Sequence, residues 1–305
     1  MNHIYDMLII GGGPGGYSAA LYAARAGLDV LVLEKLSAGG QMALTQDIDN
    51  YPGFPQGIDG FTLGENMQLG AERFGAKTEL AEVLSLDLKA DPKRIDTSEG
   101  TFYSRTVVYA AGAGPRELGI GQEQALTGRG VHYCAACDGM RYRGKTVVVV
   151  GGGNSAAEDA LALARIAEKV YLVHRRDSLR AEKLYQNALM KAANVEFIWN
   201  TQVTELLAEG KLTGVRLRDV FSGEERELAC DGLFVSVGRK PATALVTDQL
   251  ALDPGGYIVA DESTRTSVPG VFAVGDVRTK ALRQVVTAVS DGAVAVHFAR
   301  EYLEI

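Results

Sequence analysis

Two cysteines lie two residues apart in the stretch HYCAACDGM, residues 132–140, and an aspartate follows the second one. The chain has only 3 cysteines in 305 residues, so the pairing of Cys134 with Cys137 needs an explanation. Such a pair can be a redox-active dithiol, half of a metal site or a structural disulfide. Asp138 can move a proton during thiol chemistry or cap the turn behind Cys137.

The metal alternative has three ligands to offer, because His132 precedes Cys134 by two positions. A structural zinc site uses four, and neither a second C-x-x-C nor an H-x-x-x-H occurs among the 3 cysteines and 4 histidines. We therefore expect no metal. The third cysteine, Cys230, stands at the head of an apolar run and is expected to be a buried, inert thiol.

Charge and composition exclude several classes of protein. The net charge of −7 argues against a general nucleic-acid binder, and the apolar runs are too short to span a membrane. The first residues, MNHIYDMLIIGGG, show no basic leader, so a cytoplasmic protein is expected. A stable structural disulfide is unusual in that compartment, which favours a catalytic or metal-bound pair.

A glycine-rich loop near the N-terminus is the first element that a redox dithiol would need. Residues 7–16, MLIIGGGPGG, run from an apolar strand into a G-x-G-x-x-G pattern, and a helix-like stretch and a second strand follow. In a dinucleotide site the helix N-terminus faces the pyrophosphate and an acid after the second strand binds a ribose. Without a ligand, the loop would be only a glycine-rich turn. The expected binding residues are Gly11, Gly13, Pro14, Gly15, Gly16 and Glu34.

The same unit recurs from residue 146, TVVVVGGGNSA. His174 stands where Glu34 stands in the first unit, at the same spacing from the first glycine, and two arginines follow it. A carboxylate would repel a 2′-phosphate, whereas guanidinium groups bind it, so this unit is expected to bind NADP(H) rather than to form a solvated basic loop. The expected binding residues are Gly151, Gly153, Asn154, Ser155, Ala156, His174, Arg175, Arg176 and Arg180.

The two units end alike, in apolar strands that stop at Gly112 and Gly238. A last apolar strand ends at Gly275-Asp276, before a segment with helical periodicity over 283–303. This order predicts an α/β protein of two Rossmann-like, three-layer nucleotide-binding domains, the second inserted into the first. The expected limits are 1–114 with 246–305 for the first domain and 115–245 for the second, which carries the C-x-x-C.

With these motifs in place, the chain resembles the low-molecular-weight, bacterial-type thioredoxin reductases, within the FAD- and NAD(P)-dependent pyridine nucleotide-disulfide oxidoreductases. The resemblance covers nearly the full length and rests on GGGPGG, GGQM, IDNYPGF, CAACDG, GGGNSAAEDA, HRRDSLRA and VFAVGDV with RQVVTAVSDG. It implies FAD in the first domain, NADPH in the second and a homodimer. Further flavin contacts that it implies are Lys35, Gly40, Gln41, Asn50, Ala111, Gly112, Gly275, Asp276, Arg283, Gln284 and Val285.

The resemblance also implies the reaction. A hydride passes from NADPH to FAD, electrons pass to the Cys134–Cys137 disulfide, and the dithiol exchanges with the disulfide of thioredoxin or a thioredoxin-like protein. Cys137 would lie against the flavin, Cys134 would be the exchange partner, and Asp138 would move the proton. Because dithiol and nicotinamide would share one domain and the flavin would occupy the other, a rotation through 114–118 and 242–247 is expected.

One stretch departs from the family pattern. After C-x-x-C-D-G the family often carries an aromatic pair that helps to dock thioredoxin, whereas this chain has Met140 and Arg141, which leaves the redoxin partner open. The rival functions are the flavoprotein reductase of a peroxidase system, an oxygen-using dithiol oxidase and a flavin-binding redox sensor. The first normally carries an extra N-terminal domain, and the HRR stretch at 174–176 argues against the second.

Overall fold

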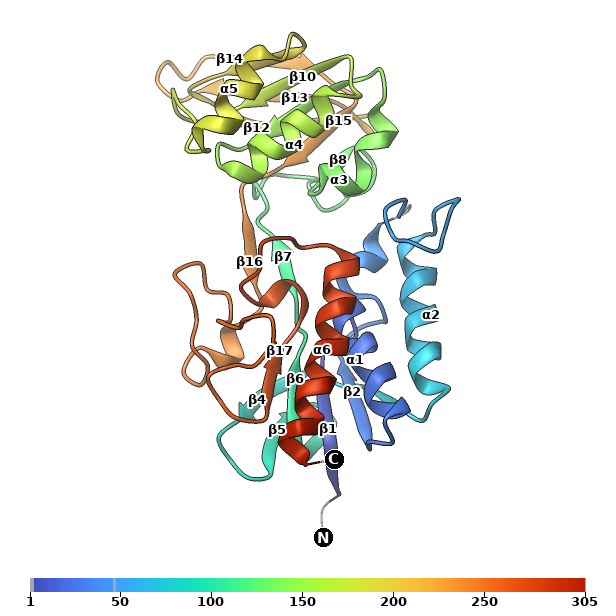
Figure 1. The fold of residues 1–305 in the computed structure, drawn as a ribbon. Helices are drawn as coiled ribbons and strands as arrows, with labels where there is room; N and C mark the ends of the chain where they lie inside the picture. Colours follow the sequence, from blue (N-terminus) through green and yellow to red (C-terminus); the bar gives the residue numbers. More distant parts are fainter. Residues whose placement is uncertain (1–2, 46–47, 305) are drawn as a thin grey trace. The chain divides into compact units, whose positions relative to one another are not determined.

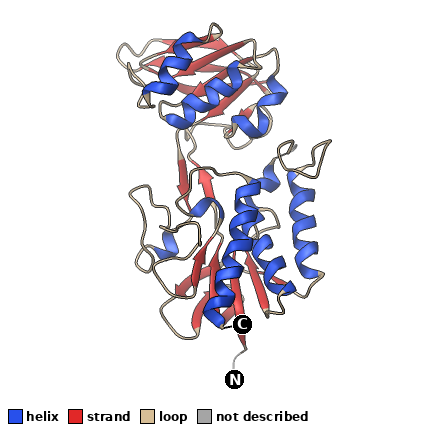
Figure 2. Ribbon diagram, viewed as in Figure 1, coloured by secondary structure: helices blue, strands red, loops and turns tan. Residues whose placement is uncertain are grey.

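A computed structural model of the chain describes residues 3–45 and 48–304 (Figure 1). The chain divides into two compact units, Met1–Gly114 with Lys240–Ile305, and Pro115–Arg239. The second unit is therefore inserted into the first. In both units helices cover strands, as the colours of Figure 2 show.

The first unit is built on a seven-stranded sheet in the order β3-β2-β1-β6-β5-β4, with β17 also paired to β6. The pairs among β1, β2, β3, β6 and β17 are parallel, whereas β4 and β5 join in antiparallel fashion. The strands are β1 (Ile4–Ile10), β2 (Val30–Glu34), β3 (Lys77–Leu80), β4 (Val83–Asp87), β5 (Lys93–Thr97), β6 (Gly100–Tyr109) and β17 (Val271–Ala273).

Side chains alternate between the two faces of this sheet. Met7 and Ile9 on β1 pack in one core cluster with residues of the helices, whereas Leu8 and Ile10 pack in another with Val246. Both faces of the parallel sheet are thereby buried, which gives the predicted layers. The helices of this unit are α1 (Pro14–Arg25), α2 (Gly60–Glu72) and α6 (Val285–Leu303), with the 3-10 helices η1 (Gly40–Leu44), η3 (Ala244–Val246) and η4 (Gly275–Val277).

The second unit repeats the plan around a parallel sheet in the order β11-β10-β9-β15-β8. Val147 and Val149 face helix α4, and Val148 and Val150 face a separate antiparallel sheet of β12, β13 and β14. The strands are β8 (Val131–His132), β9 (Thr146–Val150), β10 (Lys169–Val173), β11 (Val195–Ile198), β12 (Thr201–Ala208), β13 (Leu212–Asp219), β14 (Glu225–Ala229) and β15 (Gly232–Val235). The helices are α3 (Ala135–Asp138), α4 (Asn154–Ala164), α5 (Lys183–Lys191) and the 3-10 helix η2 (Gly139–Tyr142).

The two connections between the units pair with each other. Strand β7 (Ala113–Pro115) and strand β16 (Arg239–Pro241) form a two-stranded sheet. The chain thus re-enters the first unit at Lys240 rather than at residue 246, where the sequence placed it. The difference arises because β16 belongs to this ribbon and η3 already packs in the core of the first unit. The predicted α/β fold class, with one three-layer unit inserted in another, is confirmed.

Candidate active site

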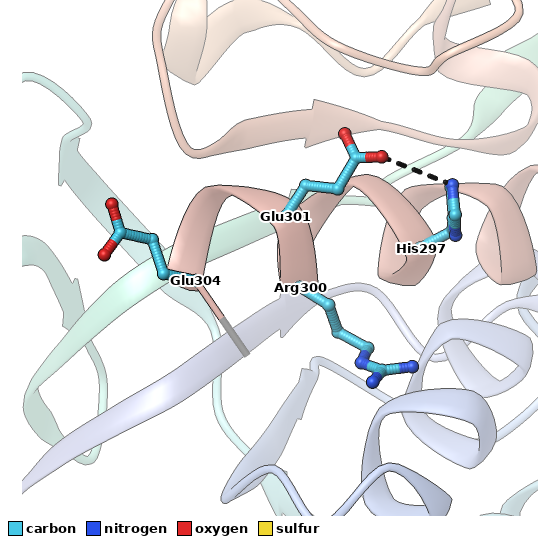
Figure 3. Close-up of a pocket in the computed structure, with 4 residues that line it drawn as sticks. All are labelled: His297, Arg300, Glu301 and Glu304. Carbon is cyan, nitrogen blue, oxygen red and sulfur yellow. Dashed lines mark ion pairs between the residues drawn. The ribbon is translucent and has the colours of Figure 1, made fainter.

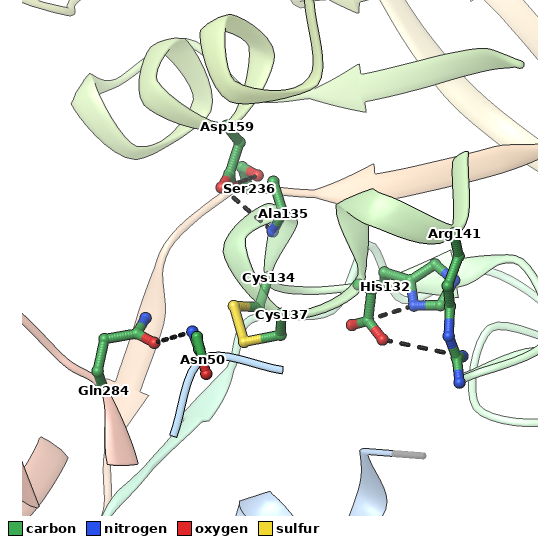
Figure 4. Close-up of a disulfide and its surroundings, with 10 residues drawn as sticks. Asn50, His132, Cys134, Ala135, Cys137, Arg141, Asp159, Ser236 and Gln284 are labelled. Carbon is green, nitrogen blue, oxygen red and sulfur yellow. Dashed lines mark hydrogen bonds and ion pairs between the residues drawn. A yellow bond between two sulfur atoms is a disulfide. The ribbon is translucent and has the colours of Figure 1, made fainter. Parts of the chain in front are cut away.

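Cys134 and Cys137 form a disulfide at the start of α3, with their Cα atoms 5.3 Å apart (Figure 4). Cys134 is the N-cap residue of the short helix and Cys137 lies within it, and both are half-buried. The first helical N–H group, that of Ala135, donates to the Asp159 carboxylate at 3.3 Å. The Ser236 hydroxyl donates to the same carboxylate at 2.5 Å. The disulfide loop is therefore fastened to α4 by a carboxylate that sequence reasoning had not identified.

Asp138 follows Cys137 directly in the chain, at the end of α3, and its side chain is 13% exposed. Its Oδ2 atom lies 3.2 Å from Nδ1 of His132, and its Oδ1 atom lies 4.0 Å from a guanidinium nitrogen of Arg141. The other nitrogen of His132 lies 2.6 Å from the Tyr142 hydroxyl. Both nitrogens of His132 thus have partners, Asp138 and Tyr142, and the two cysteine sulfurs bond to each other. Among the described residues, no group of three or more His, Cys, Asp or Glu side chains is placed to hold a metal ion.

Cys230 is buried at the head of β15, as the sequence predicted. Burial raises the pKa of its thiol to about 12, and the charge of Asp231 acts in the same direction. A thiol that stays protonated is a poor nucleophile. This leaves Cys134 and Cys137 as the pair capable of exchange chemistry.

The first glycine loop joins β1 to α1 at the carboxyl edge of the parallel strands. Gly11 has a φ of 103°, and a Cβ there would come within 2.6 Å of the Ala110 carbonyl oxygen, so only glycine fits. Gly13, the N-cap of α1, has no atom within 4 Å of its would-be Cβ, so this side of the loop is open to a close approach by a ligand. An open backbone at a helix N-terminus is what a pyrophosphate requires. The loop fits a dinucleotide.

Glu34 ends β2 beside this loop. Its Oε2 atom accepts a hydrogen bond from the Gly12 N–H group at 2.6 Å, and its Oε1 atom accepts one from Leu36 at 3.0 Å. The carboxylate is thereby held next to the loop. Lys35, in contrast, is exposed and pairs with Glu82 at 2.6 Å.

The remaining predicted flavin residues come from segments far apart in the chain. Gly39 donates to the Gly12 carbonyl at 2.8 Å, which brings Gly40 and Gln41 of η1 next to the first loop. A Cβ on Gly15 would lie 3.6 Å from the Gly275 nitrogen, and one on Gly11 would lie 3.2 Å from the Ala111 Cα atom. The segments that contain these residues therefore meet at one edge of the sheet of the first unit.

Other predicted flavin residues cluster around the start of α6. Gln284 is the N-cap of α6, directly before Val285, and accepts a hydrogen bond from the Asn50 side chain at 3.0 Å (Figure 4). Arg283 stacks on Tyr257 at 4.1 Å and donates to the Asp276 carbonyl at 3.4 Å, so it supports the Gly275-Asp276 turn. Asn50 also lines a surface pocket formed by the loop from Asp49 to Pro55.

A buried carboxylate that sequence reasoning missed fixes this turn. Asp291 on α6 accepts a hydrogen bond from the Gly275 N–H group at 2.8 Å and pairs with Arg278 at 2.8 Å and Lys280 at 2.7 Å. Burial alone would raise the pKa of Asp291, but the hydrogen bonds from Arg278 and Lys280 outweigh burial and lower it. The sequence offered one signal for this carboxylate: an acid within an apolar helical segment is buried only when it is paired.

The second glycine loop joins β9 to α4 in the same way. Gly151 has a φ of 156°, and a Cβ there would lie 2.4 Å from the Ser236 carbonyl oxygen. Gly153, the N-cap of α4, is open like Gly13. Asn154 accepts a hydrogen bond from the Glu182 N–H group and donates one to the Glu182 carboxylate, both at 2.9 Å. Ser155 and Ala156 follow in the first turn, exposed and buried respectively.

His174 lies against this second loop. A Cβ on Gly152 would come within 2.2 Å of its ring, and its Nε2 atom is buried without a hydrogen-bond partner in the part of the chain that the structure describes. Burial lowers the pKa of His174, and the charges of Arg180, Arg175 and Arg176 lower it further. The Arg180 backbone donates to the Gly152 carbonyl at 2.7 Å. Three exposed arginines therefore surround a neutral histidine with an unused polar atom, which suits an anionic ligand.

A pocket at the other end of α6 takes no part in these sites. It is lined by His297, Arg300, Glu301 and Glu304, and His297 lies 3.5 Å from Glu301 (Figure 3). His297 and Glu301 are more than half exposed, so neither is in the desolvated setting of a catalytic group. No described helix is long and apolar enough to cross a membrane.

The structure combines two glycine loops that fit dinucleotides with a half-buried disulfide that an acid follows in the chain. This combination defines an α/β dithiol oxidoreductase. The family model of pyridine nucleotide-disulphide oxidoreductases matches residues 5–292. The chain belongs to this family: it is a flavoprotein disulfide reductase whose cofactors are FAD and NADPH.

Named relatives cover nearly all of the chain. A thioredoxin reductase of Streptomyces clavuligerus is 47% identical, over 99% of this chain and 95% of its own length. One of Treponema pallidum is 45% identical, over 98% and 97%. The crystal structure of thioredoxin reductase from Streptococcus pyogenes superposes with a TM-score of 0.92 at 43% identity, over 100% of this chain and 99% of the other.

Proposed function

We propose that this protein is an NADPH-dependent thioredoxin-disulfide reductase, which passes electrons through the Cys134–Cys137 pair to thioredoxin or a thioredoxin-like protein. The observation that carries the proposal is the half-buried disulfide, with Asp138 next to Cys137 in the same short helix, on the unit that also holds the second glycine loop. The names of the relatives support the choice of acceptor. FAD, when bound, supplies the two-electron link between NADPH and the disulfide.

The exchange step needs a thiolate and a base. In the reduced protein the attacking cysteine gives its proton to the Asp138 carboxylate, and its sulfur bonds to one sulfur of the substrate disulfide. The substrate S–S bond breaks, and its second sulfur leaves with the electron pair and takes up a proton. The second cysteine then attacks the sulfur of the first, and the mixed disulfide breaks. The displaced substrate sulfur takes up the proton of the second cysteine, which restores the Cys134–Cys137 disulfide and releases a substrate with two thiols. We assign the attack on the substrate to Cys134 and the flavin side to Cys137.

We propose that the first unit holds FAD. The convergence of its glycine loop, η1 and the Gly275 turn at one sheet edge supports this, as does the open backbone at Gly13. The residues proposed to hold FAD are Gly11, Gly13, Pro14, Gly15, Gly16, Glu34, Lys35, Gly40, Gln41, Asn50, Ala111, Gly112, Gly275, Asp276, Arg283, Gln284 and Val285.

We propose that the inserted unit holds NADPH. The unsatisfied Nε2 atom of His174 and the three exposed arginines around it support a 2′-phosphate ligand. The residues proposed to hold NADPH are Gly151, Gly153, Asn154, Ser155, Ala156, His174, Arg175, Arg176 and Arg180.

We propose a cytoplasmic homodimer as the working form. The location rests on the low cysteine count and on a dithiol that must be kept reducible. The dimer is supported by large apolar side chains exposed on and beside α1 and α2 in the first unit, namely Tyr22, Phe61, Leu69 and Phe74. Analytical ultracentrifugation of the native protein and of Phe61→Glu and Leu69→Glu variants tests the assembly.

The experiment that tests the proposed function is NADPH oxidation with a panel of oxidised redoxins. The panel includes thioredoxins with acidic and with neutral docking faces, because Met140 and Arg141 stand where the family often has aromatic residues. We expect NADPH oxidation with at least one thioredoxin. We expect little NADPH oxidation when oxygen is the acceptor, and little turnover when NADH replaces NADPH. Oxygen as the only efficient acceptor would indicate a dithiol oxidase, and no turnover with any acceptor would indicate a sensor.

A further inference from the structure

His132 lies at the end of β8, and its side chain is 2% exposed. Strand β8 pairs with β15 so that His132 stands opposite Phe234, and the two rings stack with centroids 5.3 Å apart and an interplanar angle of 27°. A buried polar ring needs partners for both nitrogens. His132 has both, and they connect it to the proposed acid–base group of the dithiol.

The partners determine which nitrogen of His132 carries the proton. Burial, with the charge of Asp138 as the next cause, raises the pKa of the Tyr142 hydroxyl to about 12, so this group keeps its proton at neutral pH. An ionised Asp138 can only accept hydrogen bonds. In a neutral imidazole, Nδ1–H therefore donates to Asp138 at 3.2 Å, and the Tyr142 hydroxyl donates to Nε2 at 2.6 Å.

Tyr142 is itself fixed in place. A Cβ on Gly232 would lie 2.4 Å from its ring, so the ring occupies the space that a glycine leaves in β15. The ring also meets Phe234 edge-on at 5.3 Å, and Tyr142 is 6% exposed. The chain Asp138–His132–Tyr142 thus ends at a buried phenol with a high pKa. It is not a path for protons to solvent, and its effect must fall on Asp138.

We propose that His132 is a positioning residue for Asp138 in dithiol exchange, an inference that rests on the proposed function. Its Nδ1–H group holds Oδ2 of Asp138 beside the disulfide and stabilises the carboxylate, and the proton from the attacking thiol is carried on Oδ1. When the substrate S–S bond has broken, Oδ1 returns the proton to the leaving sulfur. His132 neither gains nor loses a proton in this cycle, and two electrons pass from the dithiol to the substrate.

Other charged groups around Asp138 must be considered in any pH effect. Arg141 lies 4.0 Å from Oδ1, and Cys134 and Cys137 lie on the same helical turn. From α4, Asp159 reaches this turn through the N–H group of Ala135. Asp231 and Cys230 act on the hydroxyl of Tyr142. His132 differs from these groups because it is a buried ring whose Nδ1 atom contacts the carboxylate itself.

The test uses the reduced holoprotein and follows alkylation of Cys134 and Cys137 by iodoacetamide, with mass-spectrometric readout, between pH 5 and 10. His132→Phe keeps an aromatic ring stacked on Phe234 but removes the Nδ1–H group that donates to Asp138. The pH at which alkylation is half-maximal should then differ from the native value by about one unit, because the carboxylate that takes up the thiol proton has lost the hydrogen bond that positions it. His132→Asn, which keeps an N–H group near the Nδ1 position, should restore most of the native profile. Tyr142→Phe should shift it less than His132→Phe.

Asp138→Asn provides the matched background. In this background the carboxylate is absent, so adding His132→Phe should change the pH profile of alkylation no further. A native pH profile of alkylation in His132→Phe, or an equal shift in His132→Asn, would overturn the proposal and leave His132 a packing residue. If His132→Phe does not fold, the comparison of His132→Asn with Tyr142→Phe decides. Alkylation needs no thioredoxin, so failure of the proposed substrate would show separately, as absent NADPH turnover in the native protein.

Discussion

At the scale of single residues, the basic cluster around His174 has the most direct consequence for cofactor choice. Each charge-assisted hydrogen bond to a 2′-phosphate is worth about 1.5–3 kcal/mol, and about 1.4 kcal/mol is tenfold in affinity. We therefore expect Arg175→Ala and Arg176→Ala each to raise KM for NADPH by about tenfold or more and to leave KM for NADH nearly unchanged. Steady-state kinetics with both cofactors measures this. Arg226→Ala, at an exposed position of β14, is the control. Equal use of NADPH and NADH by the native protein would contradict the assignment.

Asp291 is a second residue whose charge matters, here for stability. Replacing it with Asn leaves Arg278 and Lys280 buried without their anion, which typically costs about 3–5 kcal/mol. Because the folded-state pKa of Asp291 is lowered, its contribution is present above the ordinary carboxyl pKa of about 3.9 and is lost as the pH falls through the folded value. Urea unfolding of native and Asp291→Asn protein should show a large gap at pH 7 that narrows below about pH 4. A gap independent of pH would contradict this account.

At the scale of elements, the two strand–loop–helix units make separable predictions. Gly13→Ala and Gly153→Ala add a methyl group that meets no protein atom within 4 Å, so neither change should destabilise the apoprotein. Each should instead obstruct the ligand: Gly13→Ala should reduce bound FAD, and Gly153→Ala should raise KM for NADPH, both by about tenfold. Flavin absorbance per protein and steady-state kinetics report the two effects.

The control for both variants is Gly70→Ala on α2, which also meets no atom within 4 Å. If Gly13→Ala bound FAD normally and Gly153→Ala bound NADPH normally, the loops would not be the pyrophosphate sites. If Gly13→Ala instead raised KM for NADPH and Gly153→Ala reduced bound FAD, the first unit would hold NADPH and the inserted unit FAD.

The elements that could be predicted from the sequence are those encoded by local spacing. The strands and glycine turns before α1 and α4, and the cysteine pair, follow from short motifs and apolar runs. The partners of Asp291 and of His132 could not be predicted in this way, because they meet only when separate elements pack. Arg278 reaches Asp291 once η4 lies against α6, and Tyr142 reaches His132 once Gly232 leaves room for its ring.

The same limit applies to the sheet β12–β14 and to the boundary at Lys240. The antiparallel strands cover one face of the parallel sheet in the second unit. The glycine motif of that unit predicts only two strands of the parallel sheet, β9 and β10, and gives no indication of the antiparallel strands. The boundary depends on the pairing of β7 with β16, two segments more than 120 residues apart in the chain. Pairings between distant segments leave no local signal for a motif reading to use.

At the scale of the whole molecule, chain order sets a kinetic requirement. The dithiol and the proposed NADPH loop belong to the inserted unit, whereas the proposed FAD loop belongs to the other. We therefore expect the dithiol and the nicotinamide to reach the flavin in turn. We expect a covalent crosslink between the units to block one half-reaction and spare the other, which stopped-flow flavin absorbance can follow. Such movements take about microseconds to milliseconds. A locked protein that completed both half-reactions at the native rate would show that no movement is required.

The central claim is that Cys134 and Cys137 carry the electrons from NADPH to a protein disulfide, and one measurement tests it most directly. NADPH oxidation is followed with oxidised thioredoxin for the native protein, for Cys134→Ser, for Cys137→Ser and for the double variant, with bound FAD checked by absorbance. Cys230→Ser is the matched control, because its thiol is buried and has a raised pKa. The account predicts native turnover for Cys230→Ser and loss of thioredoxin reduction, with FAD retained, in the other three variants. Thioredoxin reduction by the Cys134→Ser, Cys137→Ser double variant would contradict it.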